Sequence, residues 1–199
     1  MSGKTNSRTP RQQEIVDAAR KIIASKGTKS LTVRQIAKEL EITNAALYRH
    51  FDTKNGIIRL LVGDIQDTLL NNIQEAAQKS NDPLQKLKDI FFSHLSYAEQ
   101  RKGLTFIIIN ETLSLKDKKL QKEMYEVVRK YLKTIETIVS EGINSGRFRR
   151  DINAASASIA FFGMVQATVT IWALSGFEFS LKSSHLNELF DIYKRGIVL

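Results

Sequence analysis

A stretch near the N-terminus combines residue types that can read the edges of DNA bases. Asn44 and Arg49 carry side chains that hydrogen-bond adenine and guanine, and the methyl groups of Thr43 and Ala45 can contact the methyl group of thymine. Between them, Leu47 supplies an apolar side chain that can hold the segment against a core. The spacing predicts a short helix over residues 44–50 that presents hydrogen-bonding groups and small residues to a partner.

A second short helix is expected just before this one. Thr32 and Gln35 form a capping-box pattern at the start of a helix over residues 33–40. Only residues 41–43 separate the two helices, and the small Ala37 lies where they must approach closely. This layout is typical of a helix-turn-helix, whose second helix enters the DNA major groove. An ordinary helical corner with a basic surface has the same spacing and is the alternative.

The charge distribution favours an anionic partner. The chain of 199 residues has a net charge of +9, and residues 1–55, with eleven Lys/Arg and five Asp/Glu, account for +6 of it. Nucleic acid, an acidic membrane surface and an acidic ligand are the partners that suit such an excess. Residues 1–9 are expected to be a flexible start. From Pro10 onward, basic and apolar residues alternate at helical spacing.

Catalysis and metal binding are not expected. The chain has no cysteine, which removes thiolate zinc sites, iron–sulfur ligation and cysteine nucleophiles. Its three histidines, His50, His94 and His185, show no metal-ligand spacing and belong to no motif with a nucleophile. We therefore expect a protein that is not an enzyme and that uses no metal and no cofactor.

Helices are predicted almost throughout, so the expected fold class is all-α. Apolar residues after the helix-turn-helix repeat at intervals of four: Ile57, Leu61, Ile65, Leu69 and Ile73. This spacing predicts one long amphipathic helix over residues 54–79. Further helices are expected over residues 13–26, 83–98, 120–146, 154–173 and 184–199. The run LTFIII at residues 104–109 has strand propensity but no partner strand, so we expect a buried helix there.

Residues 152–177 contain no charged residue and raise the question of a membrane span. Serine, threonine and glutamine dilute the apolar character of this segment, so we favour a buried helix of a bundle, or an oligomer seam, over a span. The N-terminus lacks the apolar stretch of a signal peptide. We therefore expect a cytoplasmic protein without a membrane partner.

The N-terminal residues together resemble the signature of TetR/AcrR-type bacterial transcription regulators. The resemblance covers about residues 10–62 and rests on residues 32–37, on residues 42–51 with the run LYRHF, and on the following Lys54. Where the family usually has glycine in the turn, this chain has Glu41. Glutamate disfavours a positive φ, so the turn must either relax or absorb strain.

The resemblance implies roles for individual residues. The residues expected to contact the phosphate backbone are Thr32, Tyr48, His50 and Lys54, and Arg34 is expected to add another contact. The residues expected to contact bases are Thr43, Asn44, Ala45, Ala46 and Arg49. The resemblance also divides the chain into an N-terminal three-helix, helix-turn-helix DNA-binding domain over residues 1–53 and a larger helical domain for effector binding and dimerisation over residues 54–199. The long helix from residue 54 joins the two.

In regulators of this kind, two late helices pair with those of a second copy, and the counterparts here are residues 154–173 and 186–197. The candidate interface residues, which could equally serve an intramolecular core, are Ala157, Ala160, Gly163, Ala167, Leu186, Leu189 and Tyr193. Residues on predicted inward faces, and polar residues within apolar stretches, are candidates for an effector pocket, although an aromatic stripe of this kind is more often core. They are Phe92, Leu95, Ile107, Glu111, Tyr125, Phe161, Met164 and Gln166.

These expectations combine into a homodimeric repressor that binds double-stranded DNA at a palindromic operator and is released by a small, largely apolar effector. The effector would change the tilt of the helix over residues 54–79 and so misalign the two recognition helices. The alternative is a DNA-associated structural or division-control protein of the same fold that recruits a protein partner. A membrane-tethered regulator comes third and depends on residues 152–177.

Overall fold

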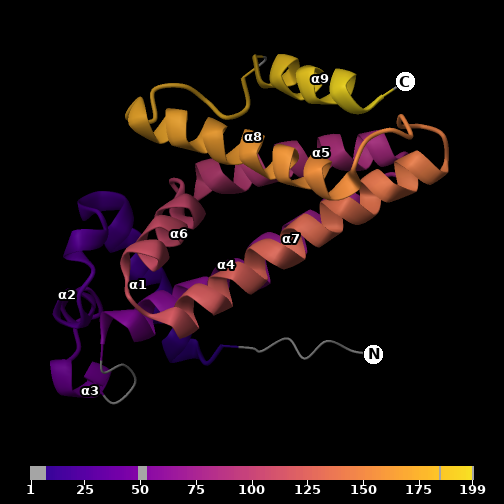
Figure 1. Cartoon of the computed structure of the whole chain (residues 1–199). Helices are drawn as coiled ribbons and strands as arrows, with labels where there is room; N and C mark the ends of the chain where they lie inside the picture. The colour runs from indigo at the N-terminus through magenta and orange to yellow at the C-terminus, as the bar shows by residue number, and fades with distance from the viewer. Residues whose placement is uncertain (1–7, 49–52, 184, 199) are drawn as a thin grey trace.

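The computed structural model describes residues 8–48, 53–183 and 185–198, and these residues form an all-helical molecule (Figure 1). The predicted all-α fold class is confirmed for this part of the chain. Its elements are α1 (Pro10–Lys26), the 3₁₀ turn η1 (Thr28–Ser30), α2 (Val33–Glu39), α3 (Asn44–Tyr48), α4 (Lys54–Ala77), α5 (Pro83–Gln100), α6 (Leu104–Ser114), α7 (Lys118–Asn144), α8 (Ala154–Leu174) and α9 (His185–Ile197).

Helices α1, α2 and α3 gather at one end of the molecule (Figure 1). The first of them begins with a complete capping box, in which the Gln12 amide N–H donates to Thr9 Oγ1 (3.2 Å) and the Thr9 amide N–H donates to Gln12 Oε1 (3.0 Å). It ends where predicted, because Gly27 takes a φ of +73° that favours glycine. Ile36 and Leu47 are fully buried and join these helices in one small core.

Helix α4 runs from this end towards the other side of the molecule and packs against α1, α5, α6 and α7. The residues spaced by four, from Ile57 to Ile73, are all buried, as their period predicted. The helix ends at Ala77, two residues earlier than expected. Since α4 touches both the N-terminal helices and the C-terminal bundle, it is the element that fixes one relative to the other.

The C-terminal bundle is built from α5, α7 and α8, with α9 lying along its outer side (Figure 1). Its interior is filled by aromatic rings: Phe91 and Phe161 pack edge to face at 6.2 Å between centroids, and Tyr131 packs against Phe162 at 5.3 Å. The run LTFIII lies in α6, so the prediction of a helix there is confirmed. The chain end returns to this bundle, where the Arg149 amide N–H donates to the carbonyl of Ile197 (3.0 Å).

Helix α8 has one buried face and one exposed face. Among the described helices, it is long and apolar enough to cross a membrane by length and composition, and only a third of its most apolar stretch is buried. Val165 and Trp172 pack inward, whereas Ile159, Ile171 and Leu174 are exposed. The expectation of a buried helix therefore holds for one face, and the other remains open on the protomer.

Two local predictions are wrong. Arg8 and Thr9, expected in a flexible start, are fixed in the structure, because Arg8 binds Asp64 and Asp67 while Thr9 caps α1. Asp82 followed by Pro83 predicts an aspartate cap at the start of α5, but the Asp82 side chain does not cap the helix and instead accepts a hydrogen bond from Arg147 Nε (3.2 Å). In both cases an arginine–carboxylate pair, which the local sequence does not reveal, decides the conformation.

Candidate DNA-binding surface and its links to the C-terminal helices

The corner between α2 and α3 has the geometry of a helix-turn-helix. The Gln35 amide N–H donates to Thr32 Oγ1 (3.1 Å) at the start of α2, and the Ala46 amide N–H donates to Thr43 Oγ1 (3.2 Å) at the start of α3. The small side chain of Ala37 is buried between the packed helices. Each short helix is thus stabilised by a side-chain cap, which compensates for the few hydrogen bonds it makes itself.

The turn between the two helices absorbs backbone strain at Glu41. This residue has a φ of +54°, in the left-handed region that glycine tolerates best. The conformation lets the Ile42 amide N–H donate to the carbonyl of Ala37 (3.0 Å), which closes the turn after α2. Of the two outcomes that the sequence allowed, the structure therefore has the strained one, at a cost of about 1–2 kcal/mol.

Most of the predicted DNA-contacting residues that the structure describes are exposed to solvent. Thr32, Arg34, Thr43, Asn44 and Ala45 are exposed, and Ala46 is half-buried beside the core residue Leu47. The remaining predictions, Arg49, His50 and the side chain of Tyr48, lie outside the described residues. The structure therefore exposes the predicted residues at the starts of α2 and α3, two helices that pack against each other.

Lys54, the last of the predicted phosphate contacts, is already bound within the protein. It begins α4, and its Nζ donates to Glu111 Oε1 of α6 at 2.5 Å. Partial burial acts to raise the pKa of Glu111, but the hydrogen bond from Lys54, a smaller effect of the Thr28 hydroxyl and the charge on Lys54 outweigh it, so this pKa lies below its usual range. Glu111, a candidate for an effector pocket in the sequence, contacts the first residue of α4 in the structure.

Two further acids continue this contact along α4. Asn55 Nδ2 donates to Asp117 Oδ2 (3.1 Å), and Arg59 Nε donates to Glu123 Oε2 (2.9 Å). We call Glu111, Asp117 and Glu123 the acidic clasp, because together they tie the first two turns of α4 to α6 and the start of α7. Sequence reasoning missed these pairs, whose partners are about 60 residues apart.

A buried carboxylate on the other side of α4 ties the N-terminal segment to the bundle. Asp64 is 1% exposed and binds Arg8, which precedes α1, Arg20 of α1, and Arg101, which follows α5. The Arg101 contact measures 3.1 Å between Nη1 and Oδ2. We call these four residues the Asp64 hub. The only sequence signal was an aspartate seven residues after Ile57, on the core face of α4.

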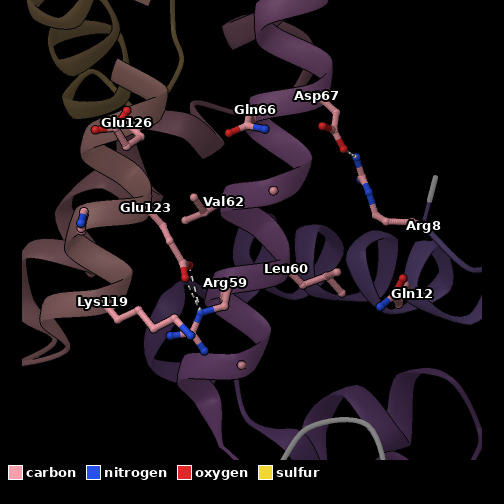
Figure 2. A pocket seen from close by; sticks show the side chains of 13 residues that line it. Arg8, Gln12, Arg59, Leu60, Val62, Gln66, Asp67, Lys119, Glu123 and Glu126 are labelled. Atoms are coloured by element: carbon pink, nitrogen blue, oxygen red, sulfur yellow. Dashed lines mark hydrogen bonds and ion pairs between the residues drawn. The ribbon is translucent and has the colours of Figure 1, made fainter. Parts of the chain in front are cut away.

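A cleft of about 840 Å³ opens between α4, α7 and the segment around Arg8 (Figure 2). Leu60 and Val62 line it with Gly56 and Gly63, which have no side chains to fill it. Its two sides are held by ion pairs, Arg8 with Asp67 (2.8 Å) on one and Arg59 with Glu123 on the other (Figure 2). The cleft therefore combines an apolar floor with cations from the segment before α1, from α4 and from α7.

Family comparison agrees with this architecture. A family model described as bacterial regulatory proteins, tetR family, matches residues 15–61, and one described as YsiA-like protein, C-terminal region, matches residues 64–192. The chain belongs to the TetR family. It is a DNA-binding transcriptional regulator, whose partners are operator DNA and a second copy of the chain. TetR-family proteins are regulators rather than enzymes.

Three relatives illustrate the likeness. The fatty acid metabolism regulator protein of Bacillus subtilis is 24% identical over 94% of this chain and 96% of its own length. The nucleoid occlusion factor SlmA of Edwardsiella ictaluri is 30% identical over 81% of this chain and 83% of its own. The crystal structure of FadR from Bacillus subtilis in complex with stearoyl-CoA superposes with a TM-score of 0.80 at 23% identity, covering 91% of this chain and 96% of that one.

The predicted effector-pocket residues of this TetR-family chain do not together line any single cavity among the described residues. Leu95 and Phe161 are fully buried in the bundle core, and Tyr125 is 63% exposed on α7. Phe92 lines a separate cavity of about 470 Å³. The half-buried remainder, apart from Glu111 in the acidic clasp, is Ile107, Met164 and Gln166. Of the three aromatic candidates, Phe161 lies in the filled core, whereas Phe92 lines a cavity and Tyr125 faces solvent.

A buried polar pair also occupies the interior of the bundle. His94 is 2% exposed, and its Nδ1 lies 3.2 Å from the hydroxyl oxygen of Tyr131. Burial lowers the pKa of His94 to about 4 and raises the pKa of Tyr131, so both are neutral at physiological pH. The sequence offered no role for His94, because a lone histidine on an apolar face carries no motif.

The predicted interface residues fall into two groups. Ala160, Gly163 and Ala167 are exposed on the open face of α8, where a partner helix can approach closely. Leu186 and Leu189 of α9 are buried and half-buried in the protomer. The half-buried Tyr193 and Ala157 are joined within one chain, since the Tyr193 hydroxyl donates to the carbonyl of Ala157 (3.1 Å).

Proposed function

We propose that this protein is a homodimeric repressor that acts in the cytoplasm, binds a palindromic operator through α2 and α3, and is released by a fatty-acyl thioester of coenzyme A. The single observation that carries the DNA-binding part is the exposed start of α3. Thr43, Asn44 and Ala45 stand clear of the core on a helix that is capped and held at a fixed angle by Leu47. In a TetR-family regulator, this is the surface that fits the major groove.

A dimer supplies the second half of the recognition surface. One short recognition helix reads too few bases for useful discrimination, and a two-fold axis doubles the contacts and demands a palindromic site. The open face of α8 supports a dimer seam, because exposed Ile159 and Ile171 flank the small residues Gly163 and Ala167. Exposing an apolar helix face of this kind to water is unfavourable in free energy, and burial against another apolar face stabilises it.

The cleft between α4 and α7 supports an amphipathic, anionic effector. Its floor of Leu60 and Val62 suits an apolar or aromatic group, and Arg8, Arg59 and Lys119 offer charge to phosphates. Stearoyl-CoA, the ligand in the crystal structure of the FadR relative, combines an apolar acyl chain with charged phosphates. An anion in the cleft draws Arg8 away from Asp67 and Arg59 away from Glu123, which loosens the contact of the N-terminal segment with α4 and the contact of α4 with α7.

Selection of bound fragments from random duplex DNA tests the DNA-binding part. We expect an enriched palindrome with half-sites about 34 Å apart. On that operator, Asn44→Ala should relax the sequence preference, whereas Lys54→Ala should weaken binding to all sequences about equally. A pool without enrichment, or two variants that bind like the wild type, would show that this surface does not contact DNA.

Titration with stearoyl-CoA, coenzyme A and stearate tests the effector part. We expect stearoyl-CoA to weaken operator binding by at least tenfold, with free coenzyme A and stearate far less effective because each supplies only half of the ligand. Arg59→Gln should raise the stearoyl-CoA concentration required. Arg129→Gln removes the same charge from α7 outside the cleft and serves as the control. If no arm of the titration changes operator affinity, the effector assignment is wrong.

The likeness to SlmA favours a second candidate function, that of a DNA-bound protein with a role in nucleoid occlusion. In that case the C-terminal bundle would receive a protein partner in place of an effector. The two functions separate in the titration above, because a protein of the second kind keeps its operator affinity at every concentration of the acyl thioester.

A further inference from the structure

The contact between Lys54 and Glu111 joins two parts of the molecule that the proposed function treats as separate. Lys54 is the first residue of α4 and follows the recognition helix by six residues, whereas Glu111 belongs to α6 of the C-terminal bundle. Their side chains are 32% and 14% exposed. The ion pair is therefore partly shielded from solvent at the end of the molecule that faces DNA.

Glu111 is held in a way that keeps it charged. Lys54 Nζ donates a hydrogen bond to Glu111 Oε1, and the pKa of Glu111 lies below its usual range. The carboxylate therefore remains negative at neutral pH. It offers Lys54 an oxygen anion at hydrogen-bonding distance, which is the same chemistry that a DNA phosphate offers.

We propose that Glu111 competes with the DNA backbone for Lys54 and so sets the operator affinity. This inference rests on the proposed function, in which Lys54 contacts phosphate. A phosphate that reaches Lys54 Nζ comes within a few ångströms of the Glu111 carboxylate, and two like charges at that separation repel each other. Binding of DNA at this position therefore requires that Lys54 leave Glu111, or that Glu111 withdraw.

The position of α6 gives the bundle control over this contact. Helix α6 packs against α1, α4, α7 and α8, so its placement depends on how the bundle is arranged. A shift that withdraws Glu111 frees Lys54 for DNA, and a shift that presses Glu111 forward holds Lys54 back. Glu111 is thus an affinity-setting residue that acts through Lys54 without touching DNA.

Operator binding by Glu111→Gln tests the proposal, measured by fluorescence anisotropy on the duplex selected above. We expect binding about three- to tenfold tighter than wild type at 150 mM salt. The slope of log K against log salt should also steepen by up to about 0.9 for each protomer of the bound dimer, because wild-type Glu111 takes up a cation when Lys54 leaves it. Glu14→Gln is the control, since it removes the same charge from an exposed pair with Arg11 in α1.

A double substitution separates the specific contact from the change in net charge. In a Lys54→Met background, Glu111→Gln should lose most of its gain, because only the direct repulsion between Glu111 and phosphate is then relieved. Equal gains from Glu111→Gln and Glu14→Gln, an undiminished gain without Lys54, or no gain at all would each overturn the proposal. Glu111→Ala gives a second reading if the glutamine variant has an altered circular dichroism spectrum. Failure of the proposed function is distinguishable, because the wild type itself would then show no salt-dependent binding.

Discussion

The Asp64 hub predicts that one buried carboxylate carries much of the attachment between the N-terminal helices and the bundle. In Asp64→Asn, the side chain keeps its volume and loses the charge that faces Arg8, Arg20 and Arg101. Three guanidinium groups, each between 14% and 22% exposed, would then face one another without a common anion. Nearby Asp67 and Asp17 compensate Arg8 and Arg20 only from more exposed positions.

The expected loss is large for a single isosteric substitution. Removing one partner from a buried ion pair costs about 3–5 kcal/mol, and the partial exposure of the arginines places this case near 3 kcal/mol. For a chain of about this length, 1 kcal/mol shifts the melting temperature by about 2–4 °C. The expected decrease for Asp64→Asn is therefore about 6–12 °C.

Thermal and urea unfolding followed by circular dichroism measure this decrease at neutral pH. Asp67→Asn is the matched control: it removes the same charge three residues away, from a side chain that is 36% exposed, and should cost less than about 1 kcal/mol. Two outcomes would refute the reasoning. One is a melting temperature of Asp64→Asn within about 2 °C of wild type, and the other is an equal loss in both variants.

Three further predictions concern stability and assembly. Burial lowers the pKa of His94 to about 4, so below pH 6.5 the unfolded chain binds more protons at this residue than the folded chain does. The protonation of His94 should therefore leave the free energy of unfolding unchanged above pH 6.5 and lower it by up to about 3 kcal/mol at pH 4. Urea unfolding between pH 4 and 7 should show that loss in wild type and not in His94→Gln, and parallel curves would contradict it. Gly163→Arg on the open face of α8 should convert dimer to monomer in sedimentation velocity with an unchanged helical spectrum, unlike the exposed control Gln74→Arg; a persistent dimer would place the seam elsewhere. Glu41→Gly relieves a φ of +54° and should raise stability by about 0.5–1 kcal/mol after the entropy cost of glycine, so an unchanged or lower melting temperature would argue against strain in the turn.

The sequence predicted the elements well because their signals are local. Spacing by four predicted α4, the capping-box pattern of Thr32 and Gln35 predicted α2, and the spacing of residues 44–50 predicted α3. The absence of any partner strand predicted that LTFIII forms a helix. Each of these signals lies within a few residues of the structure it specifies. The exposed start of α3 followed from the same short-range pattern.

The links between the two ends of the molecule could not be predicted in this way. Glu111 binds a lysine 57 residues away, and Asp64 collects arginines from three other segments. Such pairs depend on how helices pack and not on any spacing within one helix. For the same reason, the helical periodicity correctly predicted that Leu95 and Phe161 face inward, but it could not distinguish a filled core from a cavity.

Salt titration of operator binding tests the central claim most directly. If the exposed start of α3 lies in the major groove and basic residues from both protomers contact phosphates, log K should fall linearly with log salt. A dimer with six or more phosphate contacts should lose about a thousandfold in affinity between 50 and 200 mM salt. Affinity that does not respond to salt, or no binding to any duplex, would contradict the account.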